Sequence, residues 1–228
     1  MELANTEFWV GLLKIIWINI ILSGDNAVVI ALAARSLPPQ QQRFAILLGS
    51  GAAVVLRIIL TVVAAWLMSI PYLQVVGGLL LLWIGIQLLQ GEEEDEGDEV
   101  VHSSLFHAVR TILIADLVMS LDNVIAVAAA AKGSMVLLIL GLAISIPLVI
   151  FGSTLMIRLM ERFPIVVTLG AALIGWVAGE TISADTALNE WLAQWPWLHF
   201  AAAGLGALIV LMWGRLFSKH RHDEPGAA

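Results

Sequence analysis

Two short polar segments interrupt an otherwise apolar sequence, and their residue types could hold a divalent cation. The first segment, SGDNAVVIA, spans 23–31, and the second, SLDNVIAVA, spans 120–128. In each segment a serine is followed, two residues later, by an Asp-Asn pair, so each supplies hydroxyl, carboxylate and amide oxygens. Such oxygens are the ligands that hard cations such as Mg²⁺, Ca²⁺ and Mn²⁺ prefer. The two segments therefore predict a divalent metal site.

Two further polar residues lie on the same helical faces as these segments. Asn19 precedes Asn26 by seven residues, and Asp116 precedes Asn123 by seven, so each pair shares one face of a helix. We also expect a local break in the helix at 23–26, because Gly24 weakens it there. The predicted metal ligands are Asp25, Asn26, Asp122, Asn123, Asp116 and Asn19, with Ser23, Ser120 and Glu180 as secondary candidates.

The charges of the paired segments favour a divalent substrate. An aspartate at the centre of a membrane helix costs about 2.5 to 3.5 kcal/mol, so Asp25 and Asp122 need partners. If they face each other, one divalent cation neutralises both. Two close carboxylates can also hold protons while the site is empty and exchange them for metal, with Asp116 as a further proton-binding group, which predicts antiport. A purely structural network, in which Arg57 pairs with Asp25 or Asp122, stays open.

The elements that must position these residues are membrane helices. Of the 228 residues, 60% are hydrophobic and 13% are charged, which is typical of a multispanning membrane protein. A spanning helix needs roughly 20 apolar residues. We expect the first segment to be a retained helix and not a cleaved signal peptide. The predicted spans are Trp9–Ala33, Phe44–Met68, Tyr72–Leu89, Phe106–Ala131, Met135–Met160, Ile165–Glu180 and Trp197–Phe217.

The positive charges predict the orientation of these spans. With the amino terminus outside and the carboxyl terminus inside, only Lys132 falls clearly on the outer side, as the preference of cytoplasmic loops for Lys and Arg requires. The residues placed on or near the cytoplasmic side are Arg35, Arg43, Arg110, Arg158, Arg162, Arg215, Lys219 and Arg221.

The two polar segments belong to a longer internal repeat. Asn19 aligns with Asp116, and the Leu-Gly pair at 48–49 aligns with the pair at 140–141. Further along, Pro71, Gly77, Trp83 and Gln87 align with Pro164, Gly170, Trp176 and Glu180. Because each unit has an odd number of spans, the second unit must be inverted relative to the first. Inverted repeats recur in secondary transporters, where equivalent helices form one site near the midplane.

The fold class predicted is therefore an all-α membrane protein with seven transmembrane helices, built from two inverted three-helix repeats and one further helix. The predicted divisions are 1–90 for the first repeat, 91–105 for an acidic cytoplasmic loop, 106–182 for the second repeat, 183–196 for an external loop, 197–217 for the seventh helix and 218–228 for a cytoplasmic tail.

Three charged features outside the polar segments allow two interpretations each. The acidic run at 92–99 is either a solvated linker or a loose collector of divalent cations. Glu180 is either an entry ligand or a residue of the outer headgroup region. His220 and His222 either bind metal or belong to an ordinary basic tail.

Several function classes are excluded or disfavoured. The chain has no cysteine, so thiolate metal sites and disulfides are excluded, and the Lys and Arg residues form no stripe for nucleic acid. An intramembrane hydrolase is disfavoured, because the repeat gives both aspartates the same surroundings, whereas an acid and a base need different ones. We therefore expect no enzyme activity.

The segments SGDNAVVIALAA and SLDNVIAVAAA, together with GGLLLLWIGIQLL at 77–89, resemble the TerC family of bacterial integral membrane proteins. The resemblance implies export of Mn²⁺ across the cytoplasmic (inner) membrane and kinship with the lysine-exporter superfamily. It places the metal site at Asp25, Asn26, Asp122 and Asn123, with Asn19 and Asp116 beside them. The choice of Mn²⁺ over Ca²⁺ or Mg²⁺ rests on this resemblance. An alternative is a metal-binding membrane scaffold or sensor for a stress-response complex, which transports nothing.

Overall fold

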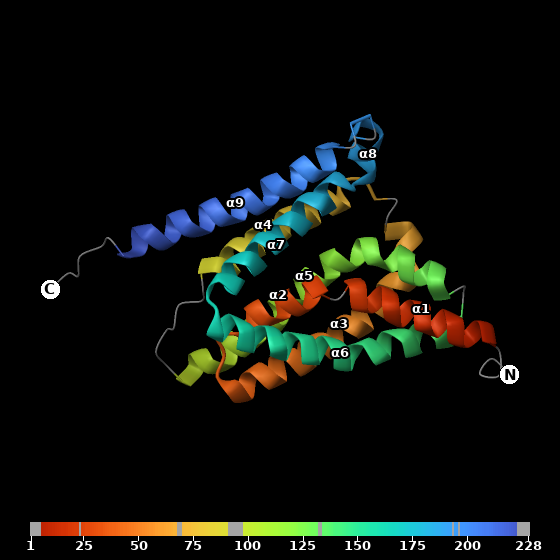
Figure 1. Cartoon of the computed structure of the whole chain (residues 1–228), viewed down its shortest axis with the longest axis horizontal. Coiled ribbons are helices and arrows are strands. Elements are labelled where there is room, and N and C mark those ends of the chain that lie inside the picture. Colours follow the sequence, from red (N-terminus) through yellow and green to blue (C-terminus); the bar gives the residue numbers. More distant parts are fainter. Residues whose placement is uncertain are drawn as a thin grey trace.

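The described part of the chain is helical throughout apart from short turns. The computed structural model describes residues 6–22, 24–67, 70–90, 98–131, 134–192, 194–195 and 197–222 (Figure 1). The helices are α1 (Thr6–Leu22), α2 (Gly24–Ala34), α3 (Pro39–Leu67), α4 (Leu73–Gln90), α5 (Asp98–Ala131), α6 (Met135–Arg162), α7 (Ile165–Ser183), α8 (Thr186–Leu192) and α9 (Trp197–His222).

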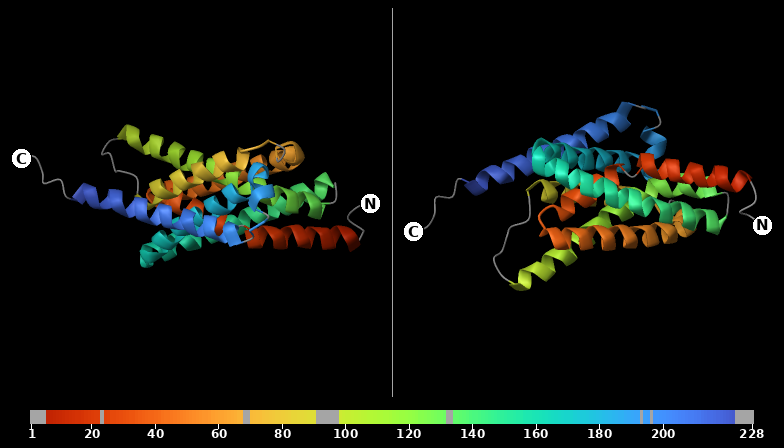
Figure 2. Two further views of the ribbon diagram at one scale, coloured as in Figure 1. Left: turned by 90° about the horizontal axis from the view of Figure 1, so that it is seen from above. Right: turned by 60° about the horizontal axis from the view of Figure 1, so that its bottom comes forward.

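Five of these helices are long and apolar enough to cross a membrane, namely α3, α4, α6, α7 and α9. They cover the second, third, fifth, sixth and seventh predicted spans. The fourth predicted span lies within α5, and the first is divided between α1 and α2. The all-α membrane class is thus confirmed for the described residues, whereas seven crossings with the amino terminus outside stay a prediction. The start of α1 and the end of α9 lie at opposite ends of the molecule, as an odd number of crossings requires (Figure 2).

The first predicted span is described as two helices, on either side of residue 23, which lies outside the described residues. Helix α1 is described to Leu22 and α2 from Gly24, and the break expected at 23–26 stays a prediction. The first amides of a helix have no carbonyl partner within it. Here the backbone N–H of Asn26 donates to Oδ1 of Asp25 at 2.8 Å, so the carboxylate satisfies part of the first turn of α2.

The helices form two layers. The first layer contains α1, α2, α3, α5 and α6, and the second contains α4, α7 and α9, which run together along the upper side of the molecule in Figure 1. The largest apolar core lies where the layers meet, and Leu32, Leu81, Ile112 and Ile174 are almost completely buried in it. This core holds the two layers together.

Packing within the first layer follows the repeat predicted from the sequence. Helix α3 packs along α5, just as α6 packs along α1 and α2. At the residue level, Gly49 lies against Ile112, and Gly141 lies against Ile15. The alignment makes Gly49 equivalent to Gly141 and Ile15 equivalent to Ile112. This reciprocity is what two repeats related by a twofold axis require, and the inverted repeat itself stays a prediction.

The second layer is held by direct contact between helix backbones. A Cβ atom added to Gly179 would collide with the carbonyl group of Ala202, and Gly175 and Gly206 meet in the same way. Small residues allow this close approach in membrane proteins, where van der Waals packing drives helix association. Helices α7 and α9 therefore form a closely packed pair.

Asp185 connects α4 to the turn between α7 and α8. Its Oδ1 accepts hydrogen bonds from the amides of Tyr72 at 3.0 Å and Ala187 at 2.8 Å, and its Oδ2 accepts from Gln74 at 3.0 Å and Val75 at 3.2 Å. Burial alone would raise the pKa of Asp185, but the four amides outweigh it and hold this pKa below its ordinary value. The charged carboxylate thus caps the beginnings of both α4 and α8.

Candidate cation site

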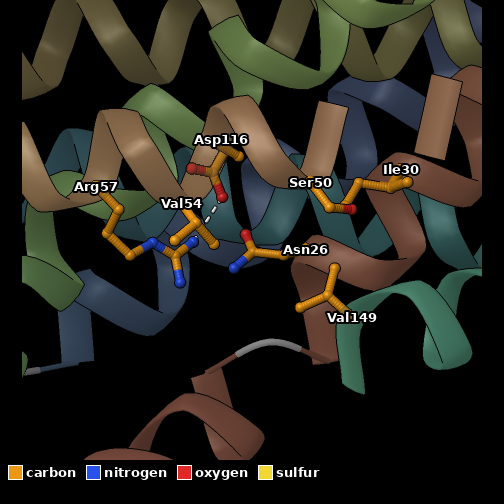
Figure 3. A pocket seen from close by; sticks show the side chains of 8 residues that line it. Asn26, Ile30, Ser50, Val54, Arg57, Asp116 and Val149 are labelled. Atoms are coloured by element: carbon orange, nitrogen blue, oxygen red, sulfur yellow. Dashed lines mark hydrogen bonds and ion pairs between the residues drawn. The ribbon is translucent and has the colours of Figure 1, made fainter. Parts of the chain in front are cut away.

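A small polar cavity lies in the first layer, where α2, α3, α5 and α6 meet (Figure 3). Its volume is about 10 Å³, which is comparable to the room that one water molecule needs. The polar lining residues are Asn26, Ser50, Arg57 and Asp116, and the apolar ones are Ile30, Ala53, Val54 and Val149. One water molecule or one ion of similar size fits among these side chains.

Helical spacing places the lining residues on the cavity. Asn26 and Ile30 lie one turn apart on α2, so both face the cavity from the same side. On α3, Ser50 and Arg57 lie two turns apart, about 10 Å along the helix axis. They therefore mark two ends of the cavity, and Figure 3 shows Asn26 between them.

Arg57 forms a buried ion pair with Asp116. Its Nη2 lies 2.5 Å from Oδ1 of Asp116, and the two side chains are 5% and 6% exposed. The Nε of Arg57 donates to Oγ of Ser120 at 3.0 Å, and that hydroxyl donates to Oδ2 of Asp116 at 3.2 Å. Both carboxylate oxygens are thus engaged. Breaking such a pair is costly, because it leaves one charge buried and uncompensated.

Asp25 lies beside the cavity and does not line it. The residue is half-buried at the beginning of α2, and its carboxylate interacts electrostatically with Arg57 and with Asp116. One positive and two negative side chains are therefore grouped here among the described residues. Their summed charge is negative, which favours a cation in the cavity.

Ser50 behaves differently from other hydroxyl residues on the helices. Serine and threonine within helices often donate to the carbonyl four residues earlier. Ser153 does so to Val149 at 2.7 Å, and Thr154 does so to Ile150 at 2.8 Å. Ser50 is 2% exposed, and its buried hydroxyl has no hydrogen-bond partner within the described part of the chain. The hydroxyl of Ser50 is thus available to a water molecule or an ion in the cavity.

The structure brings some of the predicted ligands together and separates others. Asn26 and Asp116 line the same cavity, with Ser120 bonded behind Asp116. Asn123 is half-buried on α5 and is not among the lining residues. Glu180 is exposed on α7, in the other layer, where it accepts a hydrogen bond from Trp176 at 2.9 Å.

Other predicted residues lie outside the described structure. Nothing is described of Ser23, of the side chains of Asn19 and Asp122, of the side chains in the acidic run at 92–99, or of those of His220 and His222. Within the side chains that are described, no group of three or more His, Cys, Asp or Glu residues could hold a metal ion. The oxygen donors of the cavity are of mixed type, namely amide, hydroxyl and carboxylate.

Sequence reasoning did not find the roles of Arg57 and Ser50. It considered Arg57 as a partner for Asp25 or Asp122, whereas the structure pairs Arg57 with Asp116. The repeat contains a signal for this pairing. If the alignment of 48–49 with 140–141 is extended, Arg57 becomes equivalent to Val149, just as Asp116 is equivalent to Asn19. The first repeat thus carries the arginine and the second carries the aspartate, and the residues equivalent to them, Val149 and Asn19, are both uncharged.

Similar proteins are found among bacterial membrane proteins. The membrane protein YjbE of Bacillus subtilis is 46% identical over 188 residues, which cover 82% of this chain and 86% of YjbE. The inner membrane protein YoaE of Escherichia coli is 27% identical over 186 residues, which cover 73% of this chain but only 36% of YoaE. YkoY of Bacillus subtilis is 26% identical over 227 residues, covering 91% of this chain and 68% of YkoY.

No solved structure matches the chain. The model of the TerC family of integral membrane proteins matches residues 4–222, nearly the whole sequence. With its apolar helices and its two Asp-Asn segments, this chain therefore belongs to the TerC integral membrane protein family.

Proposed function

We propose that the protein is a secondary transporter that exports Mn²⁺ or a related divalent cation from the cytoplasm across the bacterial inner membrane. Protons are the proposed counter-ion. The observation that carries the proposal is the small cavity in the first layer, where Asn26 of the first polar segment faces Asp116, which lies four residues before the second. Oxygen donors buried among membrane helices suit a hard cation that has lost most of its water.

The residues around the cavity would have separate tasks in transport. Asn26 offers an amide group at the cavity, and Asp25 adds negative charge beside it. Arg57 compensates the charge of Asp116, so the carboxylate stays buried without an external cation. The break expected at 23–26 would place the beginning of a helix within the bundle, as in transporters whose sites are built on discontinuous helices.

Transport is tested with the purified protein in proteoliposomes that contain a metal-sensitive dye. We expect Mn²⁺ flux that increases with an imposed pH gradient. Asp25→Asn and Asp122→Asn should abolish the flux while the protein stays folded. Ser153→Ala is the matched control, because it removes a buried hydroxyl that is bonded to its own helix and does not line the cavity.

The alternative outcomes separate the candidate functions. If the flux does not depend on pH, protons are not the counter-ion, but the protein is still a transporter. If the wild-type protein binds Mn²⁺ and its melting temperature rises, yet no flux occurs, the protein is a metal-binding scaffold and not a transporter.

A further inference from the structure

We propose that the cavity has two ends that hold positive charge. The guanidinium of Arg57 fills one end, and the transported cation binds at the other. Arg57 occupies the end near Asp116, and the substrate cation binds at the other end, between Asn26 and the hydroxyl of Ser50. Ser50 is then a substrate ligand, and Arg57 is a fixed counter-charge that determines where the substrate binds. The inference rests on the proposed function and specifies the site at which the cation binds.

The acidic end of the cavity is already filled. Oδ1 of Asp116 is paired with Arg57 at 2.5 Å, and its Oδ2 accepts from Ser120 at 3.2 Å. The hydroxyl of Ser120 also accepts from Arg57 at 3.0 Å. A divalent cation at these oxygens would have to displace a guanidinium group that is 5% exposed. The arginine therefore takes the place that a metal would otherwise occupy.

The opposite end of the cavity has an unused donor. Ser50 is 2% exposed and lines the cavity, and its Oγ lacks a hydrogen-bond partner among the described residues. Buried polar atoms in folded proteins are nearly always satisfied, and an exception needs an explanation such as an ion or a water molecule. Because Ser153 and Thr154 bond to their own helix, the absence of such a bond at Ser50 is a property of its site.

The spacing on α3 keeps the two ends apart. Ser50 and Arg57 are separated by two helical turns, about 10 Å along the axis, so their side chains leave α3 at different levels. Asn26 reaches the cavity from α2, and Asp25 precedes it in the same turn. The hydroxyl of Ser50 therefore stands at the open end, and the amide of Asn26 lies between it and the pair of Arg57 and Asp116 (Figure 3).

The repeat explains why only one end holds an arginine. Arg57 is equivalent to Val149, which also lines the cavity, and Asp116 is equivalent to Asn19. The ion pair thus joins one residue of each repeat, Arg57 on α3 and Asp116 on α5. The equivalent positions on α6 and α1 are both uncharged, so only the side of the cavity formed by α3 and α5 has a permanent ion pair.

The first test measures Mn²⁺ binding by equilibrium dialysis of the full-length protein in detergent, with Ser50→Ala and the matched control Ser153→Ala. We expect Ser50→Ala to weaken Mn²⁺ binding at least about tenfold, as the loss of a supporting group at a metal site commonly does. Ser153→Ala should bind as the wild type does. The melting temperature without metal should not fall in Ser50→Ala, because its hydroxyl makes no bond that is lost. Unchanged binding in Ser50→Ala would overturn the proposal.

The second test asks which end holds the metal. In Arg57→Val/Asp116→Asn, both charges of the pair are removed together, and Mn²⁺ binding should persist at a reduced affinity. Adding Ser50→Ala in this background should lower the affinity by the same factor of about ten. If the double variant is folded, melts cooperatively and binds no Mn²⁺, the cation binds at Asp116, and the proposal is wrong.

Binding and flux distinguish this inference from the proposed function. If the wild-type protein binds Mn²⁺ in a manner that depends on Ser50 but carries no flux, the inferred site is supported and the transporter proposal is wrong. If flux is lost in Asp25→Asn but is unaffected by Ser50→Ala, the transporter proposal is supported and the inferred site at Ser50 is wrong. Wild-type protein that binds none of Mn²⁺, Ca²⁺ and Mg²⁺ would overturn both.

Discussion

The two layers of the molecule satisfy their buried carboxylates in different ways. In the first layer, Asp116 is paired with the side chain of Arg57, and the hydroxyl of Ser50 is available nearby. In the second, Asp185 accepts four backbone amides, and Gly179 packs directly on the backbone of α9. Backbone amides cannot turn away without unfolding a helix end, whereas a side chain can change its rotamer.

This difference indicates which carboxylate belongs to the scaffold and which belongs to the site. Asp185 is fixed by groups that are part of the fold, so it stabilises the connection of α4 with α7 and α8. Asp116 is held by a charged side chain and not by the backbone, and it lines a cavity. A buried acid is therefore informative about function only once its partners are known.

The largest expected effect comes from breaking the ion pair in the first layer. Asp116→Asn leaves the guanidinium of Arg57 buried without its partner, so we expect the free energy of unfolding to fall by about 3–5 kcal/mol. In Arg57→Val/Asp116→Asn, most of this loss should be recovered, because no charge is left uncompensated. Denaturation followed by tryptophan fluorescence in detergent measures both variants. Equal losses in the single and double variants would contradict the interpretation of a compensating pair.

The second prediction concerns the cap in the other layer. Asp185→Asn should lower the free energy of unfolding by about 1.5–3 kcal/mol, the contribution of a hydrogen bond to a charged group, since the remaining bonds are weakened rather than all lost. Asp185→Asn should not weaken Mn²⁺ binding. A variant with normal stability and impaired binding would place Asp185 in the site and remove the distinction between the layers.

The same cap predicts a dependence on pH. Because the pKa of Asp185 in the folded protein is below its ordinary value, its stabilisation is complete above about pH 4 and is lost as the pH falls through the folded pKa. The difference in melting temperature between wild type and Asp185→Asn should thus be constant from neutral pH down to about pH 4 and should shrink below it. If the difference in melting temperature grows as the pH falls, the predicted direction of the pH dependence is wrong.

The smallest expected effect tests the close packing of α7 on α9. Gly179→Ala places a Cβ against the backbone of Ala202, so the helices must separate, at a cost of about 1–3 kcal/mol. Gly204→Ala is the control on α9, because no atom lies within 4 Å of its added Cβ. That control should be neutral or should gain up to about 1 kcal/mol from helix propensity. Thermal unfolding of both variants in detergent provides the comparison.

The features that follow from local sequence were predictable. Apolar length predicts the helices, whereas the break expected beside Gly24 falls at residue 23, outside the described residues, and stays a prediction. The all-α membrane class and the TerC family are confirmed. Metal binding by the predicted residues stays a prediction, although Asn26 and Asp116 do line one cavity.

The features that depend on distant contacts were not predictable from local patterns. Asp185 accepts the amide of Tyr72, which lies 113 residues earlier in the chain, directly before α4, and no local signal marks that partnership. The pairing of Arg57 depends on how α3 lies along α5, because several aspartates could have faced it. Ser50 reads as an ordinary small residue of an apolar helix, and only its missing backbone bond in the structure distinguishes it.

The hydrogen bond that Asp25 accepts from the backbone also has an electrostatic consequence. Backbone N–H groups at the beginning of a helix carry partial positive charge. The carboxylate of Asp25 accepts the N–H of Asn26 and so covers part of this positive charge. Asp25 therefore reduces the repulsion that these N–H groups would exert on a cation in the cavity that Asn26 lines.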